Sequence, residues 1–453
     1  MHSSITAAYL TRYRSVASAV TGAAPGELLP LTGAQRRFLI TRRRDPHART
    51  DVVPLFFAFP RGTVDPARLR RAALRLAERH PVLRGEFTVL RGTPVLRIGE
   101  PSVEVARVAV GPEEGPDGPR GPENPQGPAR AALLRALLNW PADGPVLRLL
   151  LAAGPDDEEE LLAVALDHAA CDEQSLGVVT EGLSALDAEE AADTGPSAGP
   201  PAASGSPASV DAYRAVVEGQ LAAEEKAAGE AARAHWAARL GALADPPPGV
   251  RPAGAARSTG MAAERLPAVT GAARGGVFPA LLDAVAAAAH HLDGGGGRVL
   301  ALGYPWGGRP EGAAPVLGCF LNTLVHPAPP GPPRGLDGLG ADWWDDLDHA
   351  DTPFDEVVRA ARSAGASWSG ALDGLLTFED LHRRPPLVLG GTAGREVHLA
   401  GRPLATPVAV SASHGEDLLV RLAWDRERHP DARAEEAFAV LLATLRRHLG
   451  AAA

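Results

Sequence analysis

The sequence contains a single lysine, Lys226, and only two cysteines among its 453 residues. Lys226 stands in Glu-Glu-Lys-Ala-Ala, which excludes a phosphate-binding Gly-Lys-Ser/Thr loop and leaves Schiff-base chemistry poorly supplied. Neither Cys171 nor Cys319 is part of a CxxC pair, so the sequence suggests no zinc module and no disulfide framework. This cysteine usage predicts a reducing, cytoplasmic location.

The sequence also lacks a basic stripe and a membrane-spanning segment. The formal net charge is −10, which argues against nucleic-acid binding because phosphates are neutralised by clustered Lys and Arg. The sharpest basic cluster, Arg42-Arg43-Arg44, is interpreted as a solvated surface. Residues 1–24 do not have the pattern of a signal peptide. The longest apolar stretch, Phe278–Leu292, contains Asp283 and is too short to cross a membrane.

The length and composition predict an enzyme-sized protein of two lobes, because one core rarely supports 453 residues. The Ala/Gly/Pro/Ser-rich segment 191–206 is the clearest linker. The expected domains are an N-terminal extension, a first lobe, a linker and a second lobe, at residues 1–26, 27–190, 191–207 and 208–453.

Both halves mix strands with helices, which predicts an α/β or α+β protein. The expected strands lie at 52–59, 146–152, 161–166, 298–302, 372–378 and 418–424. The expected helices lie at 34–43, 65–79, 210–240, 278–291, 352–363 and 432–449. Residues 111–128 are expected to form a surface loop.

Residues 167–175, Asp-His-Ala-Ala-Cys-Asp-Glu-Gln-Ser, are the segment most informative about function. They follow the apolar run 161–166, which predicts a buried strand, and precede the start of a helix at Ser175. A strand end is a rigid place to hold His168 at a cavity. A metal held by His168, Cys171 and Asp172 is conceivable, but three ligands within five residues of one loop make poor geometry. His290-His291 are interpreted as a helix C-terminus before the glycines 294–297.

Six segments together resemble, in order and spacing, the condensation domain of nonribosomal peptide synthetases. Each matches one motif of that family, and they run from Leu31 to Asp355: Leu31-Thr32-Gly33-Ala34-Gln35-Arg36-Arg37, Arg79-His80-Pro81-Val82-Leu83-Arg84-Gly85-Glu86-Phe87, residues 167–173, His235-Trp236, Gly303-Tyr304-Pro305-Trp306-Gly307-Gly308-Arg309 with Leu317–Thr323, and His349-Ala350-Asp351-Thr352-Pro353-Phe354-Asp355. A seventh motif is barely recognisable around Ser369–Phe378. The resemblance covers about residues 28–449.

The resemblance implies two chloramphenicol-acetyltransferase-like lobes in a V with a central tunnel. It implies an acyltransferase that joins a carrier-protein-bound acyl or aminoacyl thioester to an amine or hydroxyl acceptor, forming an amide or ester. The acceptor would be a small molecule or carrier-bound. No metal and no dissociable cofactor is expected, because the partner carrier protein supplies the phosphopantetheine arm. A monomer is expected, without nucleic-acid or membrane partners.

The resemblance also assigns roles to individual residues. His168 would take a proton from the attacking amine or stabilise the tetrahedral intermediate. Asp172 would be structural and would pair with Arg84, and Asp167 would support the loop. The residues expected on the acceptor side of the tunnel are Glu173, Ser175, Asn322 and Thr377.

Two residues depart from the family pattern. Asp167 replaces the first histidine of the third motif, and Glu173 replaces a glycine. Asp167, Asp172 and Ser175 also satisfy the Asp-x4-Asp-x2-Ser spacing of heterocyclisation domains, so this alternative stays open. His168 and the poor match of residues 405–412 to the cyclisation motif favour condensation. Glu173 leaves open a second alternative, a non-catalytic docking or recruitment domain.

Overall fold

The computed structural model describes residues 3–20, 27–44, 50–111, 127–141, 144–154, 157–193, 209–246, 258–269, 275–309, 313, 316–331 and 335–450. The expected loop 111–128 and linker 191–207 lie almost wholly outside these residues. The chain forms two compact units, each described by itself below.

Unit 1 is made of three separate stretches of the chain, residues 1–223, 307–321 and 383–399. The sequence predicted instead an uninterrupted C-terminal lobe from residue 208. The two returning stretches, 307–321 and 383–399, were not predicted because each is short. Each joins unit 1 through contacts with residues that lie far away in the sequence. Unit 2 holds residues 224–306, 322–382 and 400–453.

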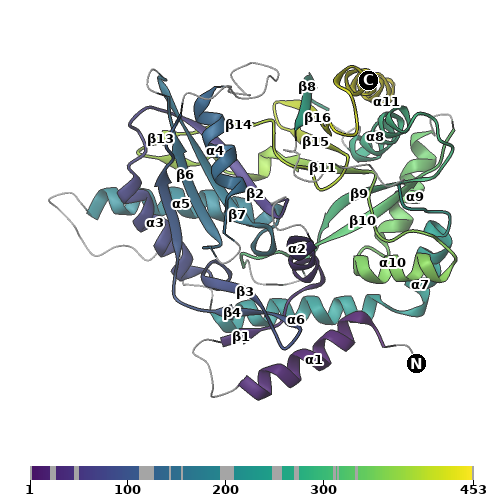
Figure 1. The fold of residues 1–453 in the computed structure, drawn as a ribbon, viewed down its shortest axis with the longest axis horizontal. Coiled ribbons are helices and arrows are strands. Elements are labelled where there is room, and N and C mark those ends of the chain that lie inside the picture. The colour runs from purple at the N-terminus through teal and green to yellow at the C-terminus, as the bar shows by residue number, and fades with distance from the viewer. Residues whose placement is uncertain are drawn as a thin grey trace. The chain divides into compact units, whose positions relative to one another are not determined.

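A five-stranded sheet of order β14-β2-β7-β6-β5 forms the centre of unit 1 (Figure 1). Its strands are β2 (Val52–Pro60), β5 (Val103–Arg107), β6 (Leu147–Ala152), β7 (Glu159–Asp167) and β14 (Arg395–Val397). The helices of this unit are α1 (Ile5–Val20), α2 (Gly33–Arg44), α3 (Pro66–Arg79), α4 (Pro128–Leu138) and α5 (Glu173–Asp193). Further short strands are β1 (Glu27–Leu29), β3 (Gly85–Leu90), β4 (Thr93–Ile98), β12 (Val388–Leu389) and β13 (Thr392–Ala393).

Strand β7 is buried on both faces, which explains its unbroken apolar sequence. Leu162, Val164 and Leu166 belong to the same apolar cluster as buried residues of α3 and α5. Ala163 and Ala165 belong to a second cluster that includes the apolar residues of α4. Asp65 caps α3 by accepting hydrogen bonds from the backbone N–H groups of Ala67 and Arg68, which confirms that expected helix start.

The first helix is part of unit 1 rather than a polar extension. Tyr9 of α1 is 2% exposed, donates a hydrogen bond to the Pro94 carbonyl at 3.0 Å and accepts one from the Leu31 N–H at 2.7 Å. These contacts tie α1 to β4 and to the start of α2, so the expected boundary at residue 26 is not a boundary in the structure.

Unit 2 is built on a six-stranded sheet of order β10-β9-β11-β15-β16-β8. Its strands are β8 (Thr259–Pro267), β9 (Leu300–Gly307), β10 (Leu321–Ala328), β11 (Gly374–Asp380), β15 (Val408–His414) and β16 (Asp417–Asp425). Its helices are α7 (Glu230–Leu240), α8 (Val277–Asp293), α9 (Leu336–Leu347), α10 (Phe354–Ser363) and α11 (Asp431–Gly450). Helices α8 and α11 pack on each other and share one apolar cluster with the sheet.

Two of the expected helices, 210–240 and 278–291, can be compared with the structure. The helix predicted over 210–240 is two helices, α6 (Val210–Ala227) and α7, because Gly229 stands at the start of the second. The boundary between the units falls within α6. Helix α8 ends after His290 and His291 with Gly294 in the left-handed conformation (φ 77°), as the sequence predicted.

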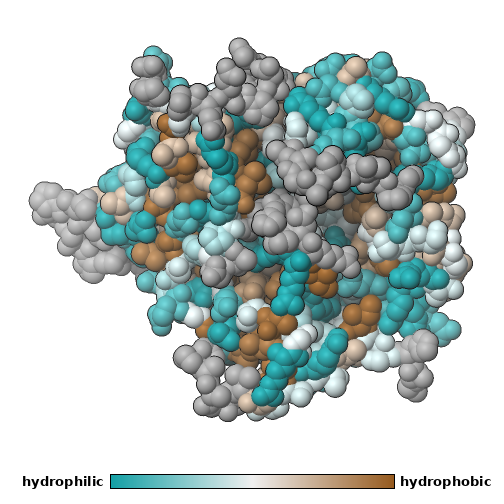
Figure 2. All heavy atoms as spheres, in the orientation of Figure 1, coloured by the Kyte–Doolittle hydropathy of each residue, from teal (hydrophilic) through white to brown (hydrophobic). Residues whose placement is uncertain are grey.

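The outer face drawn in Figure 2 mixes hydrophilic and hydrophobic residues. Among the described residues, no helix is long and apolar enough to cross a membrane.

Candidate active site

The segment 167–175 connects the end of β7 to α5, as the sequence predicted. Strand β7 ends at Asp167, a short 3-10 helix covers His168–Ala170, and α5 begins at Glu173. The side chain of Asp172 accepts a hydrogen bond from the Ser175 N–H at 3.0 Å, which satisfies one free donor of the first turn of α5. The loop is therefore fixed at one end by strand β7 and at the other end by helix α5.

His168 is held in one orientation and one tautomer. Its backbone N–H donates to the Asp51 carbonyl at 2.8 Å, and its ring stacks on Phe38 of α2 with centroids 3.9 Å apart. Nδ1 lies 3.3 Å from the Cys171 carbonyl, which can only accept, so Nδ1 carries the proton. Nε2 then carries the lone pair, and among the described residues the Nδ1 contact is the only side-chain hydrogen bond of His168.

The environment of His168 favours the neutral imidazole. Burial lowers the pKa of His168 below its ordinary value, and it outweighs the hydrogen bond to Cys171 and the nearby Asp167 carboxylate. A neutral ring with an available Nε2 can accept a proton, which is the property that a general base requires.

Asp172 is buried and fully engaged, and its guanidinium partner is Arg309. Arg309 reaches the carboxylate with both terminal nitrogens: Nη2 donates to Oδ1 at 3.0 Å, and Nη1 lies 3.0 Å from Oδ2. Oδ2 also accepts from the Phe320 backbone N–H at 3.1 Å. Asp172 therefore joins the loop to residues 309–320, the first of the returning stretches of unit 1.

The expected pair of Asp172 with Arg84 is wrong. Arg84 ends a short 3-10 helix, Pro81–Arg84, and its buried Nε has no hydrogen-bond partner among the described residues. Asp172 faces the segment around Phe320 instead, where Arg309 reaches it. The prediction of a bidentate Arg–carboxylate pair was sound in kind, but it named the wrong arginine.

Ser175 is a further part of this network rather than a residue facing open space. Its Oγ lies 2.9 Å from Asp172 Oδ1 and 2.8 Å from the Gly318 carbonyl, and it accepts from the Gly318 N–H at 3.0 Å. Arg309 Nη2 also donates to this oxygen at 3.1 Å. Ser175 is fully buried, so its assignment to the acceptor side stays a prediction and its visible contacts are structural.

Asp167 supports the loop through both of its carboxylate oxygens. Its Oδ1 accepts from the Ala169 N–H at 3.0 Å, and its Oδ2 accepts from Arg42. Arg42 also pairs with Asp51, whose carbonyl holds His168. Burial lowers the pKa of Arg42, but the two carboxylates outweigh burial and raise this pKa above its usual value.

The expected solvated surface at Arg42 is wrong. Its side chain is only 11% exposed, whereas the cluster Arg42-Arg43-Arg44 was interpreted as a solvated surface. Arg43 is exposed as expected. The signal that could have found Arg42 is the presence of two acidic residues, Asp51 and Asp167, at the facing ends of β2 and β7, which pair in the sheet.

Glu173 is exposed at the start of α5 and turns toward Arg384. Arg384 Nη2 lies 3.1 Å from Glu173 Oε1, and Arg384 Nη1 lies 2.9 Å from Glu396 Oε1. The side chain of Arg384 is 5% exposed, and it belongs to the second returning stretch of unit 1. Glu173 therefore has an ion-pair partner within its own unit.

Asn322 and Thr377 belong to unit 2. Asn322 Nδ2 donates to the carbonyls of Ala350 and Thr352, each at 2.7 Å, and so holds the segment that precedes α10. Thr377 Oγ1 lies 3.5 Å from the Val410 carbonyl of the neighbouring strand. Their assignment to the acceptor side of a tunnel stays a prediction.

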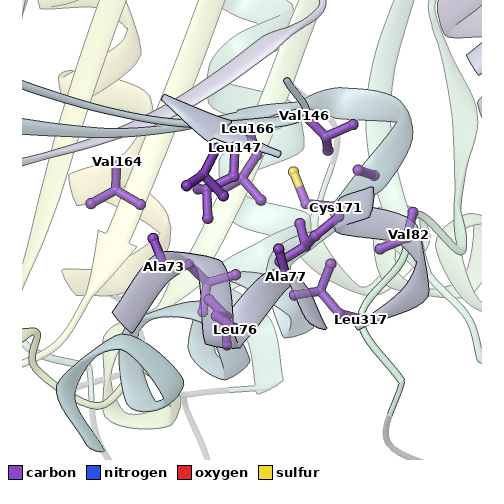
Figure 3. Packing of buried hydrophobic residues seen from close by; sticks show 14 of the residues in the cluster. Ala73, Leu76, Ala77, Val82, Val146, Leu147, Val164, Leu166, Cys171 and Leu317 are labelled. Carbon is purple, nitrogen blue, oxygen red and sulfur yellow. The ribbon is translucent and has the colours of Figure 1, made fainter. Parts of the chain in front are cut away.

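Cys171 is part of the core. Figure 3 shows its sulfur among apolar side chains that include Val82, Val146 and Leu166. Burial raises the pKa of both the Cys171 and the Cys319 thiols well above the usual value, so both are neutral. Among the described residues no group suited to a metal forms around His168.

Comparisons with known proteins identify the fold. The chain shares its fold with the starter condensation domain of rhizomide synthetase, solved with C8-CoA and Leu-SNAC (TM-score 0.67, 16% identity, 96% of this chain and 95% of that one). The first condensation domain of the CDA synthetase is similarly close (TM-score 0.66, 19% identity, 93% and 96%). So is the epimerization domain of the third module of tyrocidine synthetase B (TM-score 0.62, 13% identity, 94% and 96%).

The sequence comparisons are narrower. Tyrocidine synthase 2 of Brevibacillus parabrevis is 39% identical over 82 residues, which make up 18% of this chain and 2% of that protein. The chain matches no protein-family model. The expected two-lobe condensation-domain fold is therefore confirmed by structure, and it is shared by domains that condense and domains that epimerise.

Proposed function

We propose that the protein joins a carrier-bound acyl or aminoacyl thioester to an amine or hydroxyl acceptor, forming an amide or an ester. The observation that carries this proposal is the available Nε2 of His168, on a neutral ring whose other nitrogen donates to the Cys171 carbonyl. The fold supports it, since a relative with this fold was solved with an acyl-CoA and an aminoacyl thioester analogue.

The proposed chemistry balances without a cofactor. The acceptor nitrogen attacks the thioester carbonyl, and the tetrahedral intermediate loses a proton from nitrogen to His168 Nε2. The C–S bond then breaks, and the departing phosphopantetheine thiolate receives the proton from His168. Such proton transfer contributes about 10²–10⁴-fold, and alignment of the two reactants contributes up to about 7–11 kcal/mol.

The loop contacts explain how His168 keeps its place. Arg42 pairs with both Asp51 and Asp167, and Asp172 pairs with Arg309 and accepts a hydrogen bond from the Phe320 backbone N–H. A catalytic group must be held within a fraction of an ångström, and such buried ion pairs provide that rigidity. Asp167, Asp172, Arg42 and Arg309 are positioning residues in this proposal.

The test is a His168→Ala variant assayed with a loaded carrier protein and an amine acceptor. We expect product formation to fall about 10²–10⁴-fold while binding of the loaded carrier is kept. The His290→Ala variant, which alters a histidine on α8 of unit 2, serves as the matched control. An undiminished rate in His168→Ala would refute the catalytic assignment.

Two alternatives give different results in the same assay. A docking domain would bind the loaded carrier with no turnover in the parent protein, an outcome that Glu173 in place of glycine would favour. A heterocyclisation domain would convert a cysteine, serine or threonine acceptor into a product one water lighter. The retained His168 favours condensation over heterocyclisation.

A further inference from the structure

A second group of chemically active side chains lies in unit 2, at the ends of two neighbouring parallel strands. Strand β11 ends at Asp380 and strand β15 ends at His414, and these two residues are register partners. Side chains of partner residues in adjacent strands project from the same face of a sheet. The 3-10 helix Leu381–Arg383 follows β11 directly and carries His382.

His414 is the informative member of this group. It is 3% exposed, and its Nε2 lies 3.1 Å from the carbonyl of Val269. A carbonyl can only accept, so Nε2 carries the proton and Nδ1 carries the lone pair. Nδ1 is buried and has no hydrogen-bond partner among the described residues. A buried acceptor without a partner costs free energy, and a bound water or ion can supply the missing partner in native proteins.

His414 belongs to a group of side chains that could hold a metal ion. Ligand atoms of Asp380, His382 and His414 all lie within 4.8 Å of one another, and no other such group occurs in the part of the chain that the structure describes. The His382 and His414 rings are 5.9 Å apart at their centroids, and Asp380 Oδ1 accepts from the His382 backbone N–H at 3.3 Å. The chain thus turns so that His382 comes back beside Asp380.

The positive charge of Arg421 lies on the opposite face of the sheet from Asp380 and His414. Arg421 of the neighbouring strand β16 donates to Ser413 Oγ at 2.8 Å and lies 3.9 Å from Glu379. Ser413 and Glu379 immediately precede His414 and Asp380, so they project from the opposite face of the sheet. The positive charge is therefore on the far face, and the face with the histidines carries the carboxylate.

We infer that Asp380, His382 and His414 bind a zinc ion, with a fourth position open to water beside the exposed His382. Two imidazoles and one carboxylate are a common zinc ligand set. Zinc–ligand bonds of about 2.0–2.2 Å place tetrahedral ligand atoms roughly 3.4 Å apart, so the three ligand atoms, which lie within 4.8 Å of one another, must move closer together to close the site. A metal-binding histidine usually donates a hydrogen bond from its other ring nitrogen, which fixes the ring. The hydrogen bond from His414 Nε2 to the Val269 carbonyl would serve this purpose.

The position of the site indicates its role. His382 is the last residue of unit 2 before the chain passes into unit 1 at Arg383. A zinc ion bound there would attach this departing segment to the ends of β11 and β15. This attachment does not depend on the proposed acyl transfer.

The experiment uses untagged full-length protein freed of metal by a chelator, titrated with zinc chloride alone by calorimetry and with cobalt chloride by visible absorption. We expect one ion per chain and the absorption bands of tetrahedral cobalt. His382→Ala and Asp380→Asn should each weaken binding by at least about 10-fold. Loss of a residue that only hydrogen-bonds to a metal ligand already costs about that much, and a direct ligand should cost at least as much. His382 is exposed, so its replacement leaves the core intact.

The matched control is His291→Ala, which removes a partly exposed histidine on α8 that lies 3.3 Å from Glu436. We expect it to bind zinc like the parent. The inference is overturned if the parent binds no zinc at a ratio of one, if both site variants bind like the parent, or if His291→Ala loses the site. Circular dichroism of each variant verifies that weakened binding does not come from unfolding.

Discussion

Arg309 and Asp172 form a two-point ion pair although 137 residues separate them in the sequence. Both side chains are largely buried, with 12% and 3% exposed. The pair closes the loop that holds His168 onto the stretch 309–320. It takes the place that the family resemblance predicted for Arg84.

The first prediction concerns the two arginines. Arg309→Met leaves the Asp172 carboxylate buried without its cation, and we expect a loss of about 3–5 kcal/mol in the free energy of unfolding. Arg84→Met should cost less than about 1 kcal/mol, because it removes no ion pair. Urea denaturation followed by tryptophan fluorescence measures both. Equal losses in the two variants would contradict the assignment of Arg309.

Asp172→Asn extends the same test. An amide cannot accept both donors of the guanidinium, so we expect lower solubility and lower stability together with any loss of turnover. Normal stability combined with a selective loss of turnover would argue for a direct role of Asp172 in the reaction.

The second prediction concerns pH. A general base works as the neutral imidazole, and burial holds the pKa of His168 below its ordinary value of 6.5. We therefore expect the acid limb of the kcat/KM profile to have its midpoint below pH 6.5. A midpoint at or above 6.5 would show that the ring is not desolvated in the free enzyme.

The same lowered pKa affects stability with a definite sign. Below pH 6.5 the unfolded chain binds a proton at His168 that the folded chain resists, so stability falls as the pH falls from 6.5 through the folded pKa. His168→Asn has no proton to bind, so its stability should depend less on pH over that window. Thermal unfolding at a series of pH values provides the comparison.

The third prediction concerns Glu173 and Arg384. Glu173 is half exposed, so loss of this ion pair alone costs little, roughly 0.5 kcal/mol. Because Arg384 already holds the glutamate, we expect Glu173→Gly to change kcat/KM by less than about 3-fold. Arg384→Met frees the glutamate and should lower kcat/KM several-fold.

A double variant separates the two effects of Arg384→Met. If the freed charge of Glu173 is harmful, Glu173→Gly in the Arg384→Met background restores most of the lost kcat/KM. If turnover stays low in the double variant, the effect of Arg384 comes from its support of Glu396 and the returning stretch instead.

Local features of the chain were predictable because they depend on neighbours in sequence. Strand β7 was expected from an apolar run, and α3 from Asp65 with Pro66 and a periodic apolar face; both were confirmed. The placement of residues 167–175 between a strand and a helix followed from the same reasoning. Gly229 was overlooked as a helix break because the apolar period continues across it.

The partners of the loop were not predictable in the same way. Arg42, Arg309 and Arg384 reach Asp167, Asp172 and Glu173 through the packing of elements far apart in the chain. The sequence contains many arginines, and local patterns do not distinguish a buried one from a solvated one. Arg309 stood within a recognised motif, but the motif itself assigned it no partner.

The composition of unit 1 has a consequence for how the protein is made. Strand β14 pairs with β2 through Arg395 and Ala58, so the central sheet lacks an edge strand until residue 397 has left the ribosome. Domains usually fold as units during synthesis, but here most of the chain must emerge before the first unit can be completed. Until then β2 exposes an unpaired edge, which is a template for misassociation during synthesis. Truncation near residue 200 would leave that edge permanently open.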